Sequence, residues 1–145
     1  MEIIKHYLYT KEHEWINVDG KIATVGITEY AQSALGDITY VELPKEDFEV
    51  EQFEELASVE SVKAASDIFA PMSGRVIEVN SDLESDPGLI NRSCYEAGWI
   101  AKIEVSDAEE KSNLMSAAEY RKFLESLKEE EEELNQEEGD KEKEV

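Results

Sequence analysis

Short runs of alternating hydrophobic and polar residues dominate the first 105 positions of the chain. From Trp99 to Val105 every second residue is hydrophobic, which is the period of a half-buried β-strand. The Asp19-Gly20 pair is a strong hairpin signal between two further strand candidates. The remaining pattern predicts strands over 14–18, 21–27, 38–43, 56–59, 68–70 and 75–80. We therefore expect a mainly β domain.

Two segments show the spacing of helices instead. Thr28 is placed as an N-cap, and Gly36 follows where a C-terminal glycine belongs, which predicts a short internal helix between them. A second helix is predicted to begin near Ser116, whose spacing to Glu119 is that of a capping box. Its apolar side chains share one face: Tyr120, Phe123, Leu124 and Leu127. We expect this stripe to dock on the β core.

The composition changes after Leu127. Residues 128–145 hold ten acidic and three basic side chains and almost no apolar ones. Such a segment buries too little apolar surface to offset the entropy lost on ordering. We therefore expect one folded domain over residues 1–127. The acidic tail, 128–145, should extend the helix by its first turns and be largely disordered beyond them.

A net charge of −22 narrows the range of partners. Phosphate binding needs clustered Lys and Arg, so we expect no nucleic acid partner and no anionic membrane surface. No apolar run reaches the roughly 18 residues of a membrane span, and no secretory or transit signal is visible at the N-terminus. We expect a cytoplasmic protein, or a mitochondrial matrix protein in a processed eukaryotic form. The acidity suits basic partner surfaces and, equally, plain solubility.

Few residues offer independent chemistry. One cysteine, Cys94, permits no intrachain disulfide and no multi-cysteine zinc site. The two histidines, His6 and His13, are too few for a histidine-built metal site. His13 lies between two glutamates, but no Ser or Cys nucleophile pairs with it. We interpret it as a packed strand position.

The most informative stretch runs from Ser58 to Asp67. It lies between two strand candidates, so we expect Lys63 at or near a hairpin tip, among small neighbours. An exposed amine is the nucleophile needed to form an amide with an activated carboxylic acid. Glu60 and Asp67 flank the lysine and serve either recognition by an enzyme that acylates it or hairpin solubility. Taken alone, an exposed lysine is most often only a solvated charge.

A series of motifs along the chain strengthens the functional interpretation of Lys63. In their order and spacing, these motifs resemble the glycine cleavage H-protein family. The matching segments are Tyr9–Trp15, Ala23–Thr28, Tyr30–Gln32, Leu35–Asp37, Val41–Pro44, Val59–Ser66, Ser73-Gly74, Val79-Asn80, Asp86-Pro87, Leu89–Asn91 and Gly98-Trp99. The resemblance covers residues 7–127 without an obvious gap. Within it, Lys63 occupies the modified position of the lipoylation motif. The resemblance makes the enzyme that would read Glu60 and Asp67 a lipoylating enzyme.

The resemblance implies a flattened, mainly β barrel-sandwich hybrid of the lipoyl/biotinyl type, with a short internal helix and a C-terminal helix. It implies lipoate joined as an amide to Lys63, on a carrier without catalytic residues of its own. The implied partners are a pyridoxal-phosphate glycine decarboxylase, a folate-dependent aminomethyltransferase and an FAD-dependent dihydrolipoyl dehydrogenase. The carrier would shuttle the aminomethyl group of glycine from the first to the second.

Other readings stay open at this point. A carrier that relays lipoate to 2-oxo acid dehydrogenases needs the same lysine, and the sequence does not separate it from the first reading. A biotin carrier fits less well, because Val62 and Ala64 flank Lys63 where that pattern has methionines. The third alternative is an interaction protein that is never modified.

The chain also departs from the family pattern. Three residues stand where the family commonly has glycine: Asp47, Phe53 and Ala57. The turns there must form without glycine's conformational freedom. Cys94 stands where the family has proline, so we expect it to play no part in the shared function.

Overall fold

The structure, a computed structural model, describes residues 1–143, with side-chain positions up to Asn135. Its strands are β1 (Leu8–Tyr9), β2 (Glu14–Asp19), β3 (Ile22–Ile27), β4 (Ile38–Glu42), β5 (Glu49–Val50), β6 (Glu55–Ser61), β7 (Ala65–Phe69), β8 (Gly74–Val79) and β9 (Ala101–Val105). Its helices are α1 (Glu29–Leu35), α2 (Asp82–Ser85), α3 (Leu89–Arg92), the 3-10 helix η1 (Ala108–Asn113) and α4 (Ala117–Lys143).

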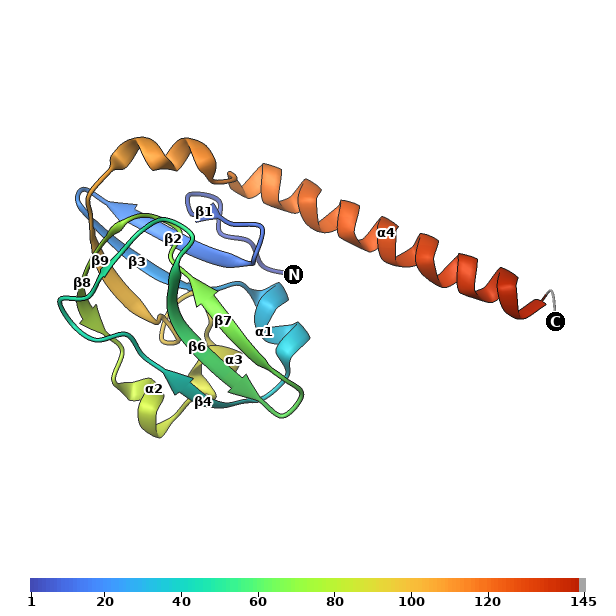
Figure 1. The fold of residues 1–145 in the computed structure, drawn as a ribbon, viewed down its shortest axis with the longest axis horizontal. Helices are drawn as coiled ribbons and strands as arrows, with labels where there is room; N and C mark the ends of the chain where they lie inside the picture. Colours follow the sequence, from blue (N-terminus) through green and yellow to red (C-terminus); the bar gives the residue numbers. More distant parts are fainter. Residues whose placement is uncertain (144–145) are drawn as a thin grey trace.

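Two antiparallel sheets form the body of the molecule (Figure 1). The larger has the strand order β1-β2-β3-β9-β8-β5, and the smaller has the order β4-β6-β7. Side chains from both sheets meet in one apolar core, which includes Val25 and Ile103 from the larger sheet and Val59 and Ile68 from the smaller. Alternating side chains bury one face of each sheet in this way. The mainly β sandwich expected from the sequence is confirmed.

The first hairpin differs from its prediction by one residue. Asp19 pairs with Ile22, so the two-residue loop is Gly20-Lys21 and not Asp19-Gly20. Gly20 has a φ of 63°, whereas Lys21 has no positive φ. A positive φ at the first loop position alone is typical of a type II′ turn, which takes glycine there.

The helix boundaries follow the capping signals in the sequence. Thr28 caps α1 by accepting a hydrogen bond from the amide of Ala31, and Gly36 ends it. Ser116 and Glu119 form the predicted capping box: each side chain accepts a hydrogen bond from the other residue's amide. Both predicted helix starts are confirmed.

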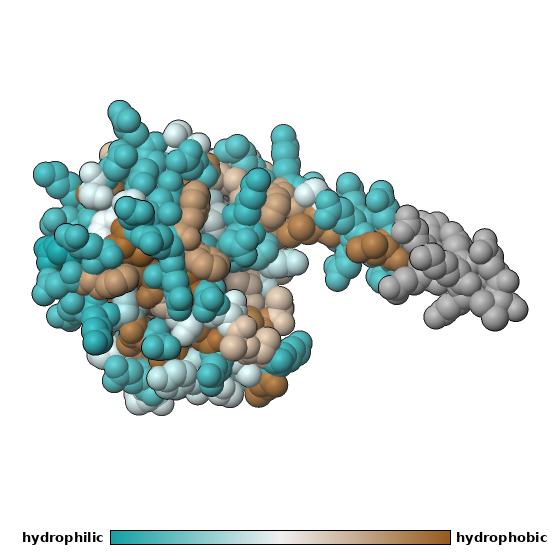
Figure 2. Space-filling model, viewed as in Figure 1, coloured by the Kyte–Doolittle hydropathy of each residue, from teal (hydrophilic) through white to brown (hydrophobic). Residues whose placement is uncertain are grey.

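The start of α4 docks on the body as predicted. Tyr120 is fully buried and stacks on Tyr9 with ring centroids 4.6 Å apart. Phe123 and Leu124 pack against the same aromatic cluster. Figure 2 shows hydrophobic side chains at the start of α4, where it meets the body.

Beyond Leu127, α4 leaves the body (Figure 1) and continues to Lys143, further than the first turns expected from the sequence. All side chains from Lys128 to Asn135 are exposed. The expected disorder of the tail 128–145 in solution stays a prediction, and residues 144 and 145 lie outside the described residues.

Deleting residues 129–145 should leave the melting temperature within about 2 °C of the full chain. The exposed side chains from Glu129 to Asn135 bury almost no apolar area, so little stability depends on them. Thermal unfolding followed by circular dichroism measures this. Deletion from Tyr120 onward is the matched control and should destabilise strongly, since Tyr120 is fully buried. A large drop in the shorter deletion would show that the acidic segment packs on the body.

Two turns keep a left-handed backbone without glycine. Asp47 and Phe53, which stand at glycine positions of the resembled family, both have a φ of 67°. Ala57 has no positive φ and lies in β6. For a bulky side chain the left-handed region costs about 1–2 kcal/mol. The left-handed backbone explains why the resembled family has glycine at positions 47 and 53. This chain forms the same turns with non-glycine residues, at the cost of backbone strain.

The strain at Phe53 can be measured with a pair of variants. Phe53→Gly should be more stable than Phe53→Ala by about 1 kcal/mol, because both lose the ring and only glycine relaxes at a positive φ. Urea unfolding of both variants measures the difference. The same pair at Glu54, which has no positive φ, should give the opposite order. Equal stability of the two Phe53 variants would contradict the strain.

Candidate functional site

A tight turn joins β6 to β7 and carries Lys63 at its tip (Figure 1). The amide of Ser61 donates to the carbonyl of Ala64 at 2.8 Å, which closes the turn. The Ser61 hydroxyl oxygen also accepts hydrogen bonds from the amides of Lys63 at 3.2 Å and Ala64 at 3.1 Å. Lys63 and Val62 are exposed. The predicted hairpin-tip position of Lys63 is confirmed.

The segment between α1 and β4 supports the tip from one side. The amide of Val62 donates to the carbonyl of Asp37 at 3.1 Å. The Lys63 side chain passes beside Gly36: a β-carbon placed on Gly36 would lie 3.5 Å from Lys63 Cε. The aliphatic part of Lys63 therefore rests against this segment, while its amine extends beyond.

The Lys63 amine is not engaged in an ion pair. Within the part of the chain whose side chains are described, the ion pairs are Arg75–Asp47, Arg92–Asp86 and Lys102–Glu78. An amine that is exposed and unpaired can enter the active site of another enzyme without first breaking an ion pair. Acylation of a lysine requires this accessibility.

Glu60 and Asp67 lie on the outer face of the smaller sheet. Val59, between Ser58 and Glu60, is buried, so alternation turns Ser58 and Glu60 outward. Asp67 pairs directly with Ser58 and therefore shares that face. The Ser58 hydroxyl donates to Glu42 at 3.2 Å. Three carboxylates, Glu42, Glu60 and Asp67, thus border the face next to the tip.

Cys94 is unsuited to redox or nucleophilic work. Its side chain is 8% exposed, and burial raises the pKa of its thiol to about 12. A thiol with this pKa stays protonated at neutral pH, and the thiolate is the reactive form. Among the described residues, no group of three or more His, Cys, Asp or Glu side chains could hold a metal ion.

His13 is packed, but not in a strand as the sequence suggested. It immediately precedes β2 with a φ of 71°. Its Nδ1 is 2.9 Å from the hydroxyl oxygen of Tyr120, and its ring centroid is 4.4 Å from the ring centroid of Tyr30. Desolvation lowers the pKa of this histidine, which favours its neutral form. His13 therefore contributes to the docking of α4.

Sequence reasoning did not single out Glu14, a glutamate that is 1% exposed. It accepts hydrogen bonds from the Thr10 hydroxyl and, at 3.2 Å, from the amide of Phe69 at the end of β7. Burial raises the pKa of its carboxyl to about 7. Nothing in the strand pattern marks it, because Glu14, Trp15 and Ile16 are all buried in succession.

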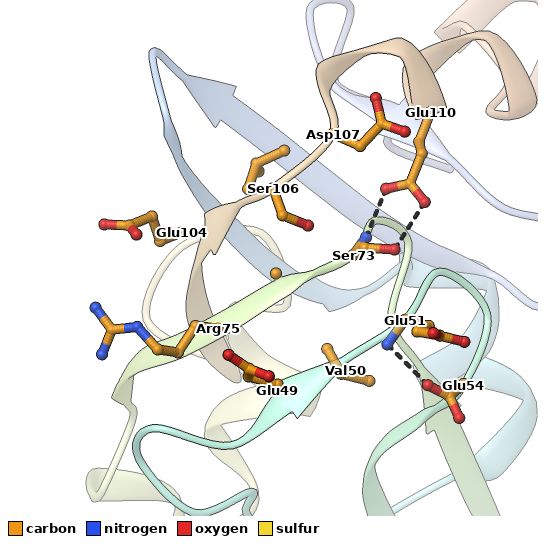
Figure 3. A pocket seen from close by; sticks show the side chains of 12 residues that line it. Glu49, Val50, Glu51, Glu54, Ser73, Arg75, Glu104, Ser106, Asp107 and Glu110 are labelled. Atoms are coloured by element: carbon orange, nitrogen blue, oxygen red, sulfur yellow. Dashed lines mark hydrogen bonds between the residues drawn. The ribbon is translucent and has the colours of Figure 1, made fainter.

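A concavity of about 740 Å³ is lined mainly by acidic side chains (Figure 3). It lies among β5, β8, β9 and η1, and no residue of the turn between β6 and β7 lines it. In it the Glu110 carboxylate accepts hydrogen bonds from the amide and hydroxyl of Ser73 at 2.8 and 2.7 Å. Most of its polar lining is carboxylate, which disfavours anionic ligands.

No helix among the described residues has both the length and the apolar character needed to cross a membrane.

Comparison with known proteins places the chain in a family. Residues 7–127 match the family model described as glycine cleavage H-protein. The glycine cleavage system H protein 4 of Aquifex aeolicus is 52% identical over 125 residues, which cover 86% of this chain and 73% of that protein. The glycine cleavage system H protein of Staphylococcus epidermidis is 47% identical over 124 residues, covering 86% of this chain and 98% of that protein.

A solved structure agrees with both relatives. The crystal structure of a glycine cleavage system H protein from Mycobacterium marinum superposes with a TM-score of 0.72 at 37% identity, covering 81% of this chain and 95% of that one. The family match ends at residue 127, so the later part of α4 lies outside it. The chain belongs to the glycine cleavage H-protein family, whose members are non-catalytic lipoyl carriers of the glycine cleavage system.

Proposed function

We propose that this chain carries lipoate as an amide on Lys63 and shuttles the aminomethyl group of glycine between the enzymes of the glycine cleavage system. The observation that carries this proposal is the geometry of the tip. Lys63 is exposed, has no ion pair among the described side chains and is held in a turn closed by Ser61. The residues present fit an acylated lysine, because small side chains leave the amine accessible.

The chain's own residues bind and present the cofactor. Acylation replaces the Lys63 ammonium with a neutral amide. The acylated side chain therefore has no positive charge that the acidic surface of the body could attract. Lipoate held on Lys63 would supply the reactive sulfurs for exchange of the aminomethyl group and for redox exchange. The partners in these exchanges would be a pyridoxal-phosphate glycine decarboxylase, a folate-dependent aminomethyltransferase and an FAD-dependent dihydrolipoyl dehydrogenase. The turn around Lys63 fixes where the arm begins, and its exposure lets the arm reach three different active sites.

The carboxylates beside the tip suit recognition by the lipoylating enzyme. Glu60 and Asp67 face outward on the smaller sheet within the same hairpin as Lys63. Opposite charges on an enzyme surface would align the hairpin and speed encounter. The net charge of −22 extends this preference for basic partner surfaces to the whole chain. A cytoplasmic location is part of the proposal.

Mass spectrometry tests the attachment. The purified chain, incubated with a lipoylating enzyme, ATP and lipoate, should gain the mass of one lipoyl group, and peptide mapping should place it on Lys63. Reconstitution with the three partner enzymes should then release CO2 from glycine. Modification of another lysine would refute the site. A modified chain that only supplies lipoate to 2-oxo acid dehydrogenases would support the relay and refute the shuttle.

A further inference from the structure

We infer that Asn91 of α3 is a positioning residue for lipoylation, which acts on Lys63 through the segment between α1 and β4. The inference rests on the proposed attachment of lipoate to Lys63. Asn91 is remote in sequence from the hairpin tip, and its side chain does not touch the amine. Its effect is transmitted by two successive contacts.

The first contact is a clamp made by the Asn91 amide. Its Oδ1 accepts a hydrogen bond from the amide of Ile38 at 2.9 Å. Its Nδ2 donates to the carbonyl of Gly36 at 2.8 Å and to Oε1 of Gln32 at 3.1 Å. One side chain therefore joins the last turn of α1, the residue that ends it and the first residue of β4. This fixes the path of residues 36–38.

The second contact joins that segment to the tip. The carbonyl of Asp37 accepts the amide of Val62, and Ile38 pairs with Ser61 at the end of β6. Gly36 has a φ of 76° and a ψ of −157°, a conformation that is essentially restricted to glycine. The side chains of Lys63 and Val62 lie beside Gly36: a β-carbon placed there would be 3.5 Å from Lys63 Cε and 3.6 Å from Val62 Cγ2.

These contacts have a consequence for recognition. A four-residue turn that projects from a sheet is mobile unless something holds it. An enzyme that modifies a mobile tip must order it on binding, and its apparent affinity falls by the fraction of tips in the competent orientation. Holding residues 36–38 in place holds Val62 and Lys63 in one orientation relative to the carboxylates of the outer face. Asn91 therefore preorganises the substrate of the lipoylating enzyme.

The test uses the full-length chain with Asn91→Ala. In the unmodified protein, hydrogen exchange at the Val62 amide should accelerate about tenfold, because its acceptor at Asp37 becomes mobile. The KM of a lipoylating enzyme for the chain should rise about tenfold with little change in kcat, since the tip is ordered once bound. Asn91→Asp keeps the acceptor for Ile38 but replaces the donor with an oxygen that faces the Gly36 carbonyl, so both changes should persist in it. It also serves if the alanine variant does not fold.

Asn80→Ala is the matched control. Like Asn91, Asn80 donates two hydrogen bonds through its Nδ2, here to the carbonyls of Ala97 and Trp99, each at 2.8 Å. Asn80 is buried and makes no contact with the tip. It should lose stability and leave both the Val62 exchange rate and the KM as in the parent chain. A parental KM in a folded Asn91 variant overturns the positioning role, and so does an equal rise in the Asn80 variant. Absence of lipoate on Lys63 in the parent chain would instead refute the proposed function.

Discussion

Lys63→Arg should abolish lipoate attachment and carrier activity completely while leaving the fold unchanged. The arginine keeps the positive charge, but its guanidinium stays protonated and offers no amine to acylate. Lys63 is exposed and forms no ion pair among the described side chains, so the free energy of unfolding should change by less than about 0.5 kcal/mol. Intact mass, urea unfolding and glycine-dependent CO2 release measure the three effects on one variant.

Lys11→Arg is the matched control, because Lys11 is also an exposed lysine outside the hairpin. It should be lipoylated and active as the parent chain is. Lipoate found on another lysine of the Lys63→Arg variant would show that the tip is not the specific site. Activity of an unmodified, folded variant would contradict the carrier mechanism itself.

The strands could be predicted where one face of the strand is buried and the other is exposed to solvent. β9 shows this alternation, and its bounds fell within two residues of the prediction because Trp99 and Ile100 precede the ladder. The two-residue strands β1 and β5 and the four-residue helices α2 and α3 were not predicted, since each spans only about one period and no pattern can repeat within it. Tertiary contacts define them.

The candidate site also contains one part that could be predicted from the sequence and one that could not. Lys63 could be placed at a tip because the signal is local: small residues between two strand candidates. The clamp could not be predicted, because Asn91 lies more than 50 residues from Gly36 and Ile38, and only the folded chain brings their polar groups together. The strain at Phe53 could be predicted in part, because the resembled family commonly has glycine at this position. Only the structure shows that the φ of Phe53 is positive.

Glu14 shows why a buried ionisable side chain cannot be recognised from a sequence pattern. The second prediction with a large effect concerns this residue. Burial raises its pKa to about 7 in the folded chain, against an ordinary value of 4.5 that the unfolded chain should keep. Below pH 4.5 both states are protonated. Between pH 4.5 and 7 the unfolded state releases the proton while the folded state retains it. Stability therefore falls as the pH rises through this window and levels off above it.

Glu14→Gln should remove this pH dependence. Glutamine does not ionise, keeps an oxygen to accept from the Phe69 amide, and can donate to the Thr10 hydroxyl. Relative to the parent, the variant should gain about 3 kcal/mol between pH 4.5 and pH 8. Urea unfolding of both proteins across this range measures the difference, which cancels the contribution of all other titrating groups.

Glu104→Gln is the matched control, because it makes the same substitution at an exposed position of a strand. Its stability difference from the parent should stay constant across the same pH range. If the Glu14→Gln curve also runs parallel to the parent, Glu14 is ionised within the folded chain throughout. The Thr10 hydroxyl and the Phe69 amide would then be strong enough to hold a buried carboxylate, and the raised pKa would be wrong. A stability gain of Glu14→Gln over the parent that grows as the pH rises would establish that the fold is held in part by a protonated glutamate between β2 and β7.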